Sequence, residues 1–69
     1  MNKRLFEAEL ILQGDTRDHL AKVLDIRYET INRKINTGAF TQTEINKIID
    51  SWKLSPDQAY NIFFSKEVS

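Results

Sequence analysis

Residues 41–52, TQTEINKIIDSW, carry the strongest local signal in the chain, because they define both the start of a helix and the face that it buries. Thr41 and Glu44 form the T-x-x-E pattern of a capping box, in which each side chain accepts a hydrogen bond from the backbone N–H of the other residue. The apolar residues that follow recur at i, i+3, i+4 and i+7: Ile45, Ile48, Ile49 and Trp52. This spacing predicts an amphipathic helix with Trp52 buried in the core.

Start and stop signals of the same kind predict helices before this one. The first covers residues 4–13 and ends at Gly14, because glycine adopts the left-handed conformation of a helix C-cap without steric cost. Thr16 is a suitable N-cap for the second helix. A third helix is expected from about Tyr28 to Asn36, followed by a loop over residues 37–40.

A fifth helix is expected after residue 55. Ser55 provides its N-cap, Pro56 occupies its first position, and Gln58 completes a second capping box. The residues expected to face the core are Leu5, Ala8 and Leu12 in the first helix, with Phe6, Leu10 and Ile11 widening that face; Leu20, Ala21 and Leu24 in the second; Ile31 and Ile35 in the third; and Ala59, Ile62 and Phe63 in the fifth.

These signals predict an all-α protein of five short helices around one core. A chain of 69 residues forms a single domain, residues 1–69, and we expect a core over residues 4–64 and a frayed tail over residues 65–69. Strand-type alternation and hairpin dipeptides do not occur in the sequence. A chain this short buries only about 60% of its unfolded surface, so each apolar residue matters for stability.

The composition argues against an enzyme. There is no cysteine, which removes disulfides, thiolate nucleophiles and cysteine-ligated zinc, and the single histidine, His19, cannot form a metal site alone. Neither a glycine-rich phosphate loop nor a GxSxG motif is present. We therefore expect no cofactor, metal or small-molecule substrate. The absence of cysteine makes a cytoplasmic location the simplest expectation. No apolar run reaches the roughly 18 residues of a membrane span, so no membrane partner is expected.

Residues 17–36, RDHLAKVLDIRYETINRKIN, have the residue types that two helices crossing at a sharp angle require. The fifth place must be small, because the two backbones approach closely there, and it is Ala21. The ninth place lies in the turn, favours a positive φ and is most often glycine. Here it is Asp25, which tolerates that conformation better than most residues. The eighth, tenth and fifteenth places must be apolar, and they are Leu24, Ile26 and Ile31.

The stretch LAKVLDIRYETINRKIN-TG, with one helix before it and two after it, resembles the lambda-repressor-like (XRE-type) helix-turn-helix domain. The later run GAFTQTEINKII…LSPDQAYNIFF is similar to the small phage repressors of the Cro and CI type. The resemblance covers residues 5 to 64. It departs from the family at Asp25, which replaces glycine, and at Lys34, which occupies a place that is often apolar and whose packing role Ile35 is expected to take.

The resemblance implies a transcriptional regulator that places its third helix in the major groove of double-stranded DNA. It implies a homodimer that binds a palindromic operator and represses by occluding polymerase. Ile31 and Ile35 must face the core, so the residues expected to contact bases are Arg27, Tyr28, Glu29, Asn32, Arg33 and Asn36. The residues expected to contact phosphates are Arg17, Lys34, Thr37 and Gly38, and the dimer interface is expected at Tyr60 and Phe64.

The net charge of zero, from ten basic and ten acidic side chains, keeps other interpretations open. A protein-interaction adaptor or anti-repressor could retain the fold without binding DNA. An antitoxin-type regulator whose tail binds a partner is a third possibility, although only five residues follow Phe64. Glu29 and Arg33 stand at i and i+4, so a simple surface ion pair is an alternative to base contact by either.

Overall fold

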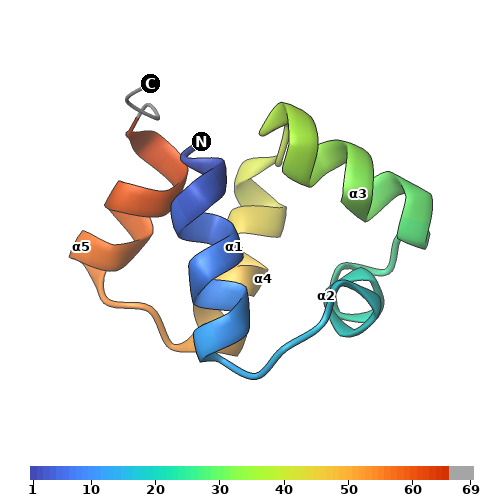
Figure 1. Ribbon diagram of the computed structural model, residues 1–69, viewed down its shortest axis with the longest axis horizontal. Coiled ribbons are helices and arrows are strands. Elements are labelled where there is room, and N and C mark those ends of the chain that lie inside the picture. Colours follow the sequence, from blue (N-terminus) through green and yellow to red (C-terminus); the bar gives the residue numbers. More distant parts are fainter. Residues whose placement is uncertain (66–69) are drawn as a thin grey trace.

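The computed structural model describes residues 1–65, and these form five helices with no strand among them. The predicted all-α class is therefore confirmed. In Figure 1, α1 runs through the middle of the molecule, with α5 on one side and with α2 and α3 on the other. The helices are α1 (Lys3–Leu12), α2 (Arg17–Leu24), α3 (Tyr28–Thr37), α4 (Gln42–Trp52) and α5 (Pro56–Ala59), which continues as the π-helical segment η1 (Tyr60–Phe64). None of the described helices is long and apolar enough to cross a membrane.

The predicted capping boxes of α4 and α5 are both present. In the first, the Glu44 N–H donates to the Thr41 hydroxyl over 3.2 Å, and the Thr41 N–H donates to the Glu44 carboxylate over 2.9 Å. Ser55 and Gln58 repeat this exchange at the start of α5. Thr16 accepts from the His19 N–H over 3.1 Å and caps α2 as expected.

The helix ends follow the sequence signals with small shifts. Asp25 adopts the left-handed conformation at φ 55°, as the ninth place of the crossing requires. Gly38 does the same at φ 71°, and a Cβ atom there would lie 3.1 Å from the Cβ of Met1. α1 begins and ends one residue earlier than predicted, and α3 includes Thr37, which was assigned to the loop. The expected fraying of residues 65–69 lies outside the described residues, apart from Ser65.

The core is centred on the ring of Phe6. Its centroid lies 5.2 Å from that of Trp52, 5.6 Å from that of Phe40 and 6.1 Å from that of Phe63. The predicted burial of Trp52 is confirmed. The other buried side chains are Leu10, Leu20, Ala21, Leu24, Ile31, Ile35, Ile45, Ile48, Leu54, Ala59, Ile62 and Phe63.

The predicted buried face of α1 is confirmed for Phe6 and Leu10 and wrong for the rest. The helix turns Phe6 and Leu10 inward, whereas Leu5, Ala8, Ile11 and Leu12 are exposed. An aromatic ring removes more apolar area from water than a leucine does, so burying Phe6 favours this rotation.

Two leucines of α1 test this rotation directly. Leu10 is 8% exposed and Leu12 is 79% exposed, although only one residue lies between them. We expect Leu10→Ala to lower the free energy of unfolding by about 2–5 kcal/mol, because it leaves a cavity. Leu12→Ala should change it by no more than about 0.5 kcal/mol. Urea denaturation of the two variants measures both values, and equal losses would contradict the observed face.

Candidate nucleic-acid interface

α2 and α3 pack against each other and are joined by the turn of residues 25–27. Figure 1 shows α2 nearly end-on and α3 lengthwise, so the two helices cross at a steep angle. The Ile26 N–H donates to the Ala21 carbonyl over 2.9 Å and closes the end of α2. Ala21 and Ile31 are buried, and Ile26 is partly buried against the core. The small and apolar residues of the crossing therefore occupy the positions that the sequence predicts.

The outer face of α3 carries most of the predicted base-contacting residues. Ile31 and Ile35 are fully buried, which confirms that Ile35 packs in the core and determines which side of α3 faces outward. The exposed predicted residues are Arg27, Tyr28, Glu29, Arg33 and Asn36, together with Thr37. Within the described part of the chain no ion pair joins Glu29 to Arg33, so Arg33 is not neutralised by its i−4 neighbour in this structure.

Asn32, another predicted base-contacting residue, is partly buried and bonded to Arg17. The Arg17 Nη1 donates to Asn32 Oδ1 over 2.7 Å, and Arg17 Nη2 lies 3.2 Å from Glu7 Oε2. The guanidinium thus links α1, α2 and α3. The phosphate contact expected of Arg17 stays a prediction. In this structure the charge of Arg17 is balanced by Glu7.

Lys34, on the other flank of α3, is paired with α4. Its Nζ donates to Glu44 Oε1 over 3.0 Å and to the Ala39 carbonyl over 3.4 Å. The side chains of Lys34 and Glu44 are 17% and 14% exposed. Burial alone would raise the pKa of the Glu44 carboxyl, but hydrogen bonds from the Thr41 N–H and from Lys34 outweigh it and hold this pKa below its ordinary value of 4.5. The predicted phosphate contact of Lys34 therefore competes with an ion pair.

The two remaining predicted phosphate contacts, Thr37 and Gly38, lie at the end of α3. The Gly38 N–H donates to the Lys34 carbonyl over 2.7 Å, so it is not free to bind a phosphate in this conformation. The exposed Thr37 hydroxyl donates to the Arg33 carbonyl over 2.8 Å. Both contacts stay predictions, and a phosphate at Gly38 would have to displace the helix cap.

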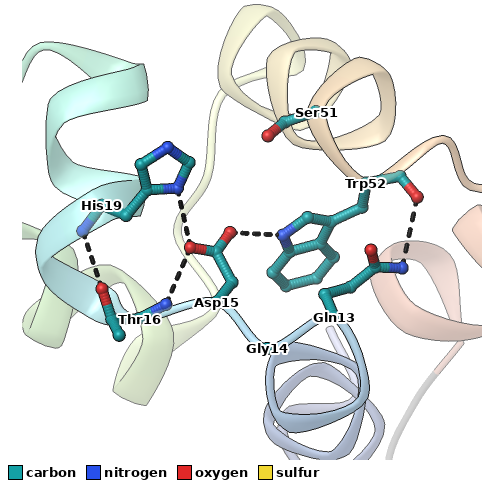
Figure 2. Close-up of a pocket in the computed structure, with 7 residues that line it drawn as sticks. All are labelled: Gln13, Gly14, Asp15, Thr16, His19, Ser51 and Trp52. Carbon is teal, nitrogen blue, oxygen red and sulfur yellow. Dashed lines mark hydrogen bonds and ion pairs between the residues drawn. The ribbon is translucent and has the colours of Figure 1, made fainter.

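A pocket of about 380 Å³ lies between the start of α2 and the end of α4. Figure 2 shows the Asp15 carboxylate in its wall, bonded to three partners: the Trp52 indole N–H, the Thr16 N–H and His19 Nδ1, each over 2.7 Å. The wall is formed by Gln13, Gly14, Asp15, Thr16, His19, Ser51 and Trp52. Through these bonds the Asp15 carboxylate holds the N-terminus of α2 against α4.

The residues expected at the dimer interface, Tyr60 and Phe64, are both exposed on η1. Their ring centroids are 6.4 Å apart, so together they form one aromatic surface. Figure 1 shows η1 and α3 on opposite sides of α1. The aromatic surface is thus available to a second copy of the chain, and the dimer stays a prediction.

Comparison of the chain with known protein families, curated proteins and solved structures gives no match. The function must therefore be inferred from the chain's own residues.

Asp15 generates a prediction about acid stability. Burial raises the pKa of its carboxyl, but the hydrogen bonds from Trp52, Thr16 and His19 outweigh burial and lower this pKa below its ordinary value of 3.8. A carboxyl with a lowered pKa stabilises the fold at neutral pH, and this contribution is lost as the pH falls below about 4.

We expect Asp15→Asn to cost about 1.5–3 kcal/mol at pH 7, the range for hydrogen bonds to a charged group. The difference from the original chain should shrink at pH 3. Asp50→Asn, at an exposed position of α4, is the matched control. Urea denaturation at both pH values gives the comparison, and a difference that grows on acidification would show that the sign is wrong.

Proposed function

We propose that the chain is a sequence-specific DNA-binding transcriptional regulator with a lambda-repressor-like helix-turn-helix, and that α3 enters the major groove. The observation that carries this proposal is the outer face of α3. Its exposed side chains include Arg27, Glu29, Arg33 and Asn36, on a helix anchored by two fully buried isoleucines. Arginine and asparagine hydrogen-bond purine edges, and glutamate accepts from cytosine N4.

Arg33 is the central base-reading residue of the proposal. It lies about 200° around the helix from Ile31, opposite the buried side, because each residue advances a helix by about 100°. It is exposed, and its guanidinium can bond guanine O6 and N7 together. Arg27, at the N-cap of α3, adds a second exposed guanidinium at the start of the helix.

Charge pairing predicts that affinity for arbitrary DNA is modest. Non-specific binding grows with the number of phosphates that cationic side chains neutralise. Arg17 and Lys34 are paired with Glu7 and Glu44, so their contribution to this electrostatic attraction is reduced. Base contacts and dimerisation would then supply most of the affinity. In this proposal Tyr60 and Phe64 join two copies on a palindromic operator, and the dimer represses by excluding polymerase.

The same ion pairs favour a second candidate function, a protein-interaction adaptor or anti-repressor. The chain has no net charge, and α1 exposes Leu5, Ile11 and Leu12, which a protein partner could cover. Selection of bound sites from random DNA separates the two candidates. A regulator enriches a sequence with two related half-sites, whereas an adaptor enriches none.

The third prediction concerns Arg33. Arg33→Ala should weaken binding to the best selected site by about 1–3 kcal/mol and relax the base preference at one position of each half-site. Lys47→Ala removes the same charge from an exposed position of α4 and is the matched control. Fluorescence anisotropy at fixed salt, followed by repeated site selection, measures both effects. If Arg33→Ala leaves affinity and base preference intact, α3 does not read the groove through this residue.

The fourth prediction concerns the dimer. A single short helix contacts too few base pairs for tight binding, so two protomers should occupy each operator, with half-sites about one helical turn apart. The double variant Tyr60→Ala, Phe64→Ala should lower the stoichiometry or the cooperativity of binding. Ile11→Ala removes an exposed apolar side chain from α1 and is the control. Sedimentation with operator DNA counts the protomers, and one protomer saturating the site would rule out the dimer.

A further inference from the structure

The guanidinium of Arg17 lies between a carboxylate of α1 and an amide of α3. Nη2 is 3.2 Å from Glu7 Oε2, and Nη1 donates to Asn32 Oδ1 over 2.7 Å. The Arg17 side chain is only 28% exposed. Its two partners lie 10 and 15 residues away in sequence, so neither contact follows from the periodicity of α2. This arrangement differs from that of Arg33, which is exposed on the outer face of α3.

The chemistry of arginine determines how the Asn32 amide is oriented. A guanidinium has N–H donors and no acceptor, so only the amide oxygen can face Arg17. The amide nitrogen, with its two N–H donors, must then point to the other side. A hydrogen bond from a charged donor at 2.7 Å is among the strong ones, so it opposes rotation of the amide. Glu7 accepts from the other terminal nitrogen of the guanidinium and balances its charge.

We propose that Arg17 is a positioning residue for base recognition, which locks the Asn32 amide so that it presents hydrogen-bond donors to the major groove. This inference rests on the proposed function, in which α3 lies in the groove. Its consequence is a restriction on one base of each half-site: the base that faces Asn32 must present an acceptor. Guanine, adenine and thymine have such acceptors at N7 and O6, at N7, and at O4.

Cytosine is the base that this arrangement rejects. In the major groove cytosine presents its N4 amino group, which is a donor. It needs the amide oxygen of Asn32, and that oxygen is turned toward Arg17. Without Arg17 the amide can rotate by half a turn and accept from cytosine N4. Arg17 therefore acts on sequence preference through Asn32, and its effect on base choice is separable from any contact that it makes with a phosphate.

The test uses the full chain and begins with the position that Asn32 reads. Site selection with Asn32→Ala identifies the base whose preference depends on this residue. Anisotropy is then measured on the best site and on the same site with cytosine at that position. We expect the original chain to bind the cytosine site about tenfold more weakly, the scale of a single mismatched base pair. Arg17→Met, which keeps a long side chain but removes the donors, should abolish most of that tenfold difference.

Two further variants separate positioning from charge and from folding. Arg17→Lys keeps a charged donor for Asn32 and should restore the rejection of cytosine. Arg17→Gln presents an amide of its own, which can face Asn32 with either end, and should behave like Arg17→Met. Thermal unfolding of each variant checks that the fold is intact. If Arg17→Met and Arg17→Gln weaken binding to all sites alike and still reject cytosine, Arg17 is a phosphate contact or a structural residue and the proposal is wrong.

A measurement without DNA keeps this inference distinguishable from the proposed function. In NMR spectra of the free protein, the side-chain amide of Asn32 should give two well-dispersed N–H signals that survive in Arg17→Lys and move to the positions of a free amide in Arg17→Met. Unchanged signals in Arg17→Met would show that Arg17 does not hold the Asn32 amide, whatever the protein binds. If the lock is present but no DNA sequence is selected, the proposed function fails and the reading of bases by Asn32 fails with it. If sites are selected with the same cytosine preference in Arg17→Met, this inference alone is overturned.

Discussion

Burial of the Phe6 ring is the interaction on which the rest of the structure depends. The ring meets Phe40, Trp52 and Phe63, so one side chain joins α1 to α4, to the segment before α4 and to η1. In a chain of 69 residues few side chains can remove as much apolar surface from water at one point. Because Phe6 faces inward, the rotation of α1 is set, and Glu7, the next residue, reaches Arg17 at the start of α2.

The contacts that continue from Glu7 connect core packing to the proposed DNA-reading surface. Glu7 holds Arg17, and Arg17 holds the amide of Asn32 on α3. Had α1 buried Leu5 and Leu12 instead, Glu7 would have turned away by about 130°, because each residue advances a helix by about 100°. The packing of α1 therefore influences a polar side chain on α3 through the bonds that Arg17 makes to Glu7 and Asn32.

Local signals in the sequence predicted helix starts and turns well, whereas side-chain pairs distant in sequence were missed. The capping box of Thr41 and Glu44 and the left-handed Asp25 depend on residues within one helical turn, so the sequence alone indicates them. The bond from Trp52 to Asp15 spans 37 residues, which no periodicity encodes. The buried face of α1 was missed for another reason: apolar residues nearly surround that helix, and only the packing of Phe6 with rings from other segments decides between the faces.

In the proposed function, the same long-range pairs would let a chain without net charge read DNA. Lys34 is held by Glu44 on one flank of α3, and Asn32 by Arg17 on the other. These bonds use charge to fix α3 and its polar side chains before any partner is present. Side chains that are already ordered lose less conformational entropy on binding, so fewer attractive contacts are needed for a given affinity.

Between these two flanks, the exposed surface of α3 includes Arg27, Glu29 and Arg33. In the proposed function, the pairing of Arg17 and Lys34 lowers the attraction to any phosphate backbone, whereas Arg27 and Arg33 keep their charge for contacts with base edges. A zero net charge is in this sense compatible with DNA recognition, because the distribution of the free charges, and not their sum, determines what the helix face can distinguish.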